Sequence, residues 1–100
     1  MPIELELKRR VQLYGTEKSA WHFIVLPKNV SKDLKQMFQG MTGGFGSLPV
    51  EVTIGKTVWR TSIFYSAKDK AFLLPIKAMV RKNENISIGK TVSFTMKILI

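Results

Sequence analysis

The stretch VEVTIGKTVWRTSIFY, residues 50–65, holds two runs rich in β-branched and aromatic residues, separated by a Gly-Lys pair. The first run alternates apolar and polar residues, which is the pattern of a strand with one buried face. Glycine supplies the positive φ that a two-residue hairpin turn requires. The stretch therefore predicts a β-hairpin that turns at Gly55 and Lys56.

The string IGKTV of this hairpin, residues 54–58, recurs at residues 88–92. Gly-Lys-Thr also ends the phosphate-binding loop of nucleotide-binding proteins, but that loop needs a glycine five residues earlier and must open a helix. Val50 and Glu84 stand at those earlier positions, and both copies run on into strand-like sequence. Both copies are therefore interpreted as turns that lead into strands, and not as nucleotide sites.

Strand patterns also occupy residues 3–13, 21–26, 71–74 and 91–100. The first and last of these alternate almost perfectly between apolar and polar residues. Arg9 breaks the apolar side of the first strand, so it is expected near an end of the fold or beside a partner.

A helix is predicted at about residues 30–40, because apolar residues fall at i, i+4, i+7, i+8 and i+11 from Val30 onward. Asn29 or Ser31 is expected to cap its start and Gly40 to end it. The residues expected to face away from the core are Lys32, Lys35, Gln36 and Gln39.

Residues 76–82 predict a second, short helix, whereas GGFGSLP at 43–49 predicts a loop. The chain is thus mainly β, with six or seven strands. Closing these strands into a barrel removes exposed strand edges. We expect one domain over residues 1–100, a small closed or nearly closed β-barrel with two helices.

The composition is basic, with 16 Lys and Arg against 7 Asp and Glu, a net charge of +9. Such a surface attracts polyanions without regard to sequence, although evenly spread cations also serve solubility alone. The chain has no cysteine, so thiolate metal sites and cysteine nucleophiles are excluded. A cytoplasmic protein without cofactor, metal or membrane association is expected, and the sequence leaves its oligomeric state open.

Three segments carry a family resemblance: WHFIVLP at 21–27, GFGSLPVEVTIGKTVWRTSIF at 44–64 and FLLPIKAMVRKNENISIGKTVSFTM at 72–96. Together they resemble the bacterial and archaeal family called domain of unknown function 1905. The resemblance implies a small β-barrel crossed by a helix, found alone or fused to a bacteriocin-protection domain, with no established activity.

In this family, recurrent polar positions match Ser62, Lys77 and Arg81. The sequence departs from the family at Lys90, where Gly-Asp is usual before the last strand. That departure adds positive charge and argues against an acid-dependent site at this turn.

Lys77 and Arg81 stand at i and i+4 of the short predicted helix, where like charges repel by roughly 0.2–0.5 kcal/mol. Either an internal acid such as Glu84 or Glu51, or the last carbonyls of the helix, or a bound anion would offset this repulsion. A bound anion defines a candidate site made of Ser62, Lys77, Arg81, Lys82 and Arg60.

His22 is the only histidine and is expected to pack in a strand or at its rim, because no orienting partner or nucleophile is assigned to it. Aromatic residues in strands either pack or stack on bases and sugars. The residues open to both roles are Trp21, Phe45, Trp59, Phe64, Tyr65 and Phe72.

Three functions remain, in order of preference. The first is a non-enzymatic binding module for an anionic small molecule or, without sequence specificity, nucleic acid. The second is a protein-interaction or structural domain linked to bacteriocin protection. The third is a metal-independent enzyme that would use Ser62, His22, Lys77 and Arg81.

Overall fold

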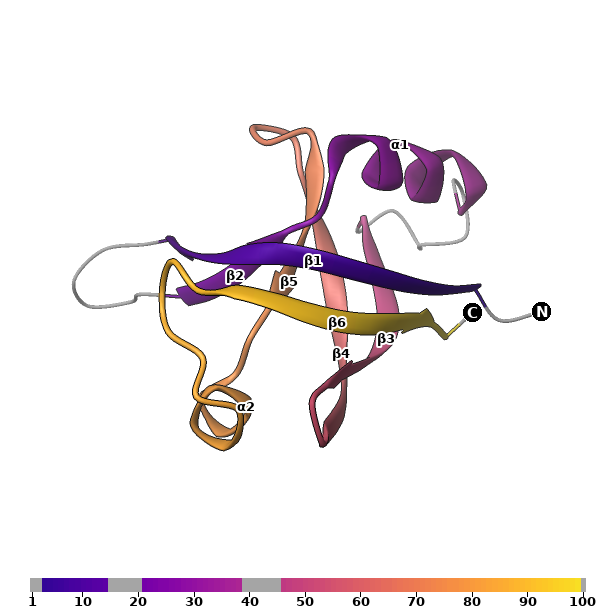
Figure 1. Cartoon of the computed structure of the whole chain (residues 1–100). Helices are drawn as coiled ribbons and strands as arrows, with labels where there is room; N and C mark the ends of the chain where they lie inside the picture. Colours follow the sequence, from indigo (N-terminus) through magenta and orange to yellow (C-terminus); the bar gives the residue numbers. More distant parts are fainter. Residues whose placement is uncertain (1–2, 15–20, 39–45, 100) are drawn as a thin grey trace.

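The computed structural model describes residues 3–14, 21–38 and 46–99, and the strands in these ranges form a closed antiparallel barrel (Figure 1). Around the barrel they follow the order β1-β2-β5-β4-β3-β6, and β6 pairs back with β1. The expected mainly β barrel with one longer and one short helix is confirmed. The strands are β1 (Ile3–Tyr14), β2 (Trp21–Val25), β3 (Ser47–Ile54), β4 (Thr57–Ser66), β5 (Ala71–Pro75) and β6 (Thr91–Ile98).

The predicted hairpin is confirmed: β3 and β4 pair up to Ile54 and Thr57 and are joined by Gly55 and Lys56. Gly55 has φ +58, and Gly89, just before β6, has φ +87, so both Gly-Lys pairs serve as turns. The predicted loop at 43–49 is partly wrong, since β3 already begins at Ser47. Burial of the next residue, Leu48, inside the barrel explains the longer strand; residues 43–45 lie outside the described ranges.

Arg9 lies where β1 changes partner, since the strand pairs with β6 up to Arg10 and with β2 from Val11 onward. Its side chain is on the apolar side of β1, as the sequence indicated, and its Nε donates to the Val25 carbonyl at 2.9 Å. Arg9 thus satisfies a carbonyl of β2 at the point where β1 and β2 part.

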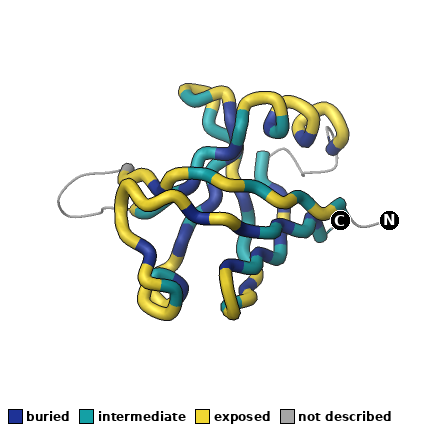
Figure 2. Tube along the Cα trace, viewed as in Figure 1, coloured by how far each residue is buried: buried dark blue, intermediate teal, exposed yellow. Residues whose placement is uncertain are grey.

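Alternate residues of every strand point into the barrel and form a continuous core (Figure 2). The helix α1 (Lys28–Met37) lies over one end, where Leu34 and the following Phe38 are buried. The helix α2 (Ala78–Asn83) lies at the opposite end, where Val80 and the following Ile86 are buried (Figure 1). The two helices therefore close the two ends of the barrel.

The start of α1 differs from the prediction. The N-cap is Pro27, without a side-chain capping bond, so the expected capping by Asn29 or Ser31 is wrong. Ser31 is instead completely buried, and its hydroxyl accepts a hydrogen bond from the Phe72 N–H at 2.9 Å. A tertiary contact thus takes the hydroxyl that would have capped the helix. Gly40, expected to end the helix, lies outside the described residues.

The short helix also begins later than predicted, at Ala78 instead of Ile76. The Ile76 N–H donates to the His22 carbonyl at 2.9 Å, so the chain continues beside β2 past the end of β5. Lys77 is extended, with φ −70 and ψ 158, and is the N-cap. The helix ends with Asn85 at φ +55 and an Ile86 N–H bond to the Arg81 carbonyl, the Schellman arrangement.

Candidate functional site

The structure brings three of the five predicted site residues to the outer side of β4 and β5. Arg60 and Ser62 alternate with inward residues of β4, and Arg60 forms an ion pair with Glu51 of β3 at 3.2 Å. Lys77 is exposed and follows the buried Ile76, so strand alternation sets it on this outer side as well. Ser62 is half-buried there.

Arg81 is separated from this group, because its guanidinium turns toward β2. Its Nε donates to the Ile76 carbonyl at 3.2 Å, and its Nη1 lies 3.2 Å from Nε2 of His22. Lys82 is exposed on α2. Since Lys77 is the N-cap and not part of α2, the two cations do not share a helix face as the sequence had indicated.

His22 accepts the hydrogen bond from Arg81, since a guanidinium can only donate. We therefore assign the neutral ring, with its proton on Nδ1, which is buried and has no hydrogen-bond partner in the described structure. Burial, followed by the nearby positive charge of Arg81, lowers the pKa of His22 below 6.5.

The sequence suggests two internal acids as partners for Lys77 and Arg81. Glu51 pairs with Arg60, whereas Glu84 accepts a hydrogen bond from the Thr57 hydroxyl at 2.6 Å. Across the described ranges, neither carboxylate pairs with Lys77 or Arg81. The Arg81 guanidinium instead donates hydrogen bonds to the Ile76 carbonyl and to the His22 ring.

The constellation considered for an enzyme is not assembled. His22 shares the inward side of β2 with the buried Ile24, whereas Ser62 points outward from β4. The Ser62 hydroxyl therefore lies on the opposite side of the barrel wall from the imidazole. No group of three or more His, Asp or Glu able to hold a metal ion occurs in the part of the chain that the structure describes.

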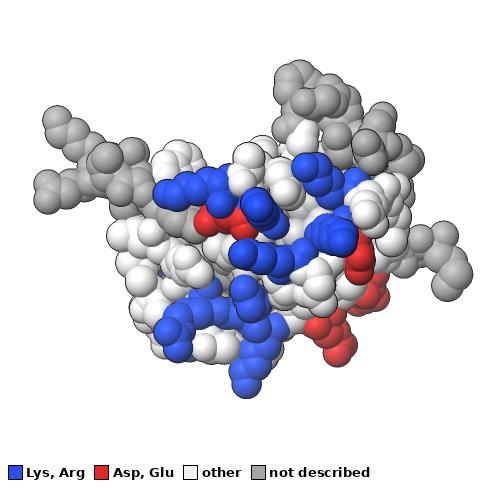
Figure 3. All heavy atoms as spheres, turned by 90° about the horizontal axis from the view of Figure 1, so that it is seen from above, with Lys and Arg blue, Asp and Glu red and all other residues white. Residues whose placement is uncertain are grey.

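A concentration of lysines lies elsewhere, between α1 and the turn from β4 to β5. A hollow of about 440 Å³ is found there, which we call the lysine hollow. None of the described residues that line it carries a carboxylate. Figure 3, a view onto the α1 side, shows Lys and Arg atoms spread over this face, with some Asp and Glu atoms between them. The lining residues are Lys28, Lys32, Lys35, Gln36, Tyr65 and Lys70.

Two elements position these lysines. Lys28, Lys32 and Lys35 stand at i, i+4 and i+7 of α1, so they share one face of the helix. Lys35 is held by a cation–π contact, with Nζ 4.0 Å from the centre of the Tyr65 ring. Lys70 approaches from the turn before β5, where its backbone adopts φ +52.

The hydroxyphenyl ring of Tyr65 connects the hollow to the core. It packs edge-on against the buried Phe72 with ring centres 5.4 Å apart. The Tyr65 ring thus contacts the buried Phe72 on the side of the core and the Lys35 ammonium group on the side of the hollow. The helical periodicity predicts Lys32 and Lys35 on the outer face of the helix, and their i+4 and i+7 spacing from Lys28 is the sequence signal for this cluster.

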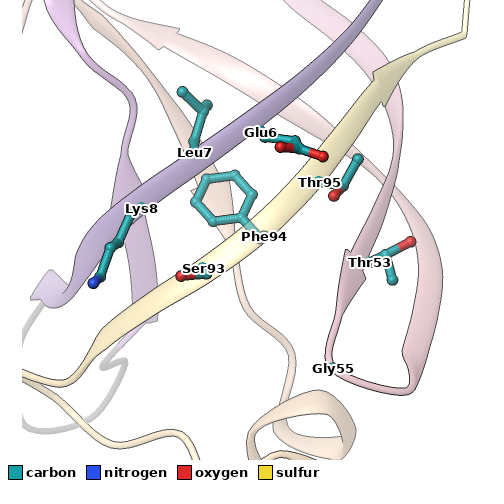
Figure 4. Close-up of a pocket in the computed structure, with 8 residues that line it drawn as sticks. All are labelled: Glu6, Leu7, Lys8, Thr53, Gly55, Ser93, Phe94 and Thr95. Atoms are coloured by element: carbon teal, nitrogen blue, oxygen red, sulfur yellow. The ribbon is translucent and has the colours of Figure 1, made fainter.

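A second hollow, of about 410 Å³, lies on the outer side of β1 and β6 beside the β3–β4 turn (Figure 4). Its charged lining residues are Glu6 and Lys8, next to hydroxyl groups from Thr53, Ser93 and Thr95. One carboxylate and one ammonium group give this hollow no preferred sign of charge, so it is the weaker candidate for binding an anion.

The class that fold and sites define is a small barrel closed by two helices, with a basic hollow at one end. The chain belongs to the family described as Domain of unknown function (DUF1905), whose model matches residues 10–96. The resemblance seen in the sequence is therefore confirmed. A search of curated proteins finds no match. In the described ranges, no helix has the length and apolarity needed to cross a membrane.

Proposed function

We propose that this protein is a non-enzymatic binding module that holds a multiply charged anion, such as a phosphate chain, in the lysine hollow. The observation that carries the proposal is the lining of that hollow, with four lysines and no carboxylate among its described residues. Lysine ammonium groups are compact donors with three N–H bonds each, and they suit phosphate oxygens.

The charges of the residues that line the lysine hollow favour such a ligand. Lys28 and Lys32 are four residues apart on α1, and Lys32 and Lys35 are three apart. Each like-charged pair costs roughly 0.2–0.5 kcal/mol in a helix, and the lining supplies no opposite charge. An anion in contact with all three side chains would offset this repulsion and form charge-assisted hydrogen bonds.

Titration calorimetry with tripolyphosphate tests the proposal. We expect Lys32→Ala with Lys35→Ala to weaken binding at least tenfold, because two ammonium contacts are lost. Arg10→Ala with Lys56→Ala removes the same charge from exposed positions that line neither hollow and is the matched control. That control should stay within twofold of the unmodified chain at equal ionic strength.

An equal loss of affinity in both double variants would mean that net charge alone attracts the ligand. Failure of the unmodified chain to bind tripolyphosphate at low salt would also overturn the proposal. The four positions are exposed on the surface, and a circular dichroism spectrum of each variant checks that the barrel is retained.

A further inference from the structure

The outer side of β2, β5 and β4 carries a group of apolar side chains that the core does not use. We call it the aromatic face. Trp21 is 59% exposed and Phe64 is 49% exposed, whereas the others are half-buried. The aromatic face consists of Trp21, Phe23, Val25, Phe64, Leu73 and Pro75.

The strand register makes this face continuous. Leu73 of β5 is paired with Val25 on one side and with Phe64 on the other, and Phe23 is paired with Pro75. The rings of Trp21 and Phe23 stack, with centres 6.4 Å apart and planes inclined by 26°. The contact with Phe23 therefore fixes the orientation of the Trp21 ring, and the exposed part of that ring is available for stacking.

Cations border the face at the end where Trp21 lies. The register that pairs Phe23 with Pro75 sets Lys77 level with Trp21, and the Ile76 N–H bond to the His22 carbonyl maintains this register beyond β5. Arg60 lies on the same side of β4, two strand positions from Ser62 and four from Phe64. Its side chain is 75% exposed despite the ion pair with Glu51.

We infer that the aromatic face binds single-stranded nucleic acid. Bases would stack on Trp21 and Phe64, and the backbone phosphates would contact Lys77 and Arg60. Trp21 and Phe64 are two strands and four residues apart, which is about 17 Å from ordinary sheet spacings. That separation suits a short single-stranded segment, because every base offers a flat face for stacking.

Charge and shape favour this occupant over the alternatives. A duplex keeps its base faces stacked inside, so it would use the cations and leave the aromatic rings without partners. A second copy of this chain carries the same net charge of +9, so two copies approaching through this face would repel each other. Single-stranded nucleic acid matches both the positive border and the aromatic centre. The inference concerns a different surface from the lysine hollow and does not depend on the proposed function.

Fluorescence anisotropy with a labelled oligothymidylate of about 12 nucleotides, within the usual site size of such proteins, tests the inference. Trp21→Ala and Phe64→Ala should each weaken binding by about 5- to 160-fold, the range of one lost stacking contact. Ile88→Ala removes another exposed apolar side chain, 52% exposed and not part of this face, and should leave binding unchanged. Thermal unfolding of each variant confirms that the barrel is retained.

Three results would overturn the inference. One is equal affinity of the Trp21→Ala, Phe64→Ala and Ile88→Ala variants. Another is duplex DNA of the same length binding as tightly as the single strand. The third is light scattering that shows a dimer which Phe64→Ala dissociates, because the face would then be a protein interface. Trp21→Ala should retain tripolyphosphate binding in the hollow, which separates this test from the earlier one.

Discussion

At the scale of single residues, Gly55 shows how one position joins turn geometry to a tertiary contact. Its φ of +58 favours glycine, and a Cβ atom placed there would overlap the carboxylate of Glu84. That carboxylate accepts the hydrogen bond from Thr57, so the absence of a side chain at Gly55 lets α2 and the β3–β4 turn meet.

Gly55→Ala is therefore expected to lower the free energy of unfolding by about 2–4 kcal/mol, the sum of backbone strain and a displaced hydrogen bond. Gly89→Ala is the matched control, because φ is +87 there but nothing lies within 4 Å of the added Cβ. It should cost about 1–2 kcal/mol. Urea unfolding measures both. A Gly55→Ala loss equal to the Gly89→Ala loss in the unmodified chain, or a Gly55→Ala loss that stays the same in a Glu84→Ala background, would contradict the role of the carboxylate.

His22 makes a second prediction at this scale. Its pKa in the folded chain lies below 6.5, so as pH falls the unfolded chain takes up the proton first. The contribution of neutral His22 to stability is complete above pH 6.5 and is lost as pH falls toward the folded pKa.

Between about pH 7.5 and 5.5 the unmodified chain should therefore lose more unfolding free energy than His22→Asn does. Other titrating groups cancel in this difference. Parallel stability curves over that pH range would show that the bond to Arg81 does not hold His22 neutral.

At the scale of elements, α1 is anchored to the barrel by Ser31 as well as by its apolar side. The Ser31 hydroxyl is fully buried and satisfies the Phe72 N–H of β5. Ser31→Ala would leave this buried donor without a partner, so we expect a loss of about 1–3 kcal/mol in stability. Ser87→Ala, at an exposed position, should change stability by less than about 0.5 kcal/mol.

The second consequence of Ser31→Ala concerns the hollow. Because α1 carries three of its lysines, a less firmly held helix should also weaken tripolyphosphate binding. Hydrogen exchange would report faster exchange of the Phe72 amide in Ser31→Ala than in Ser87→Ala. Unchanged exchange at Phe72 would contradict the anchoring role.

Sequence patterns predicted the strands well because barrel walls bury every second residue, and alternation records this directly. Val50, Val52 and Ile54 are inward and buried as their spacing indicated. Helix starts were predicted less well, since Ser31 and Ile76 take part in tertiary hydrogen bonds that override local capping signals. Local sequence contains no record of such partners.

The candidate site was harder to predict for the same reason. The periodicity placed Lys32 and Lys35 outside the core, but it could not show that the turn with Lys70 faces them across Tyr65. Nor could spacing show that Arg81 turns to His22 and leaves Lys77 on the other side of the wall. These arrangements depend on strand order around the closed barrel.

At the scale of the whole molecule, the barrel separates its basic regions. The lysine hollow lies at the end that α1 covers, whereas Lys77 and Arg60 border the aromatic face toward the α2 end. A net charge of +9 attracts any polyanion at low salt, so bulk affinity alone does not locate a site. A specific site binds the anion at one place on the surface, whereas attraction by net charge alone spreads the anion over all exposed lysines.

Backbone amide NMR during a tripolyphosphate titration at about 0.15 M salt, where long-range attraction is screened, measures this localisation directly. If tripolyphosphate binds in the lysine hollow, the amide shifts of Lys32, Lys35 and Lys70 should saturate at one bound ligand per chain. Shifts that rise together at Lys8, Lys56 and the other exposed lysines without saturation, or that centre on Lys77 and Arg81, would contradict it.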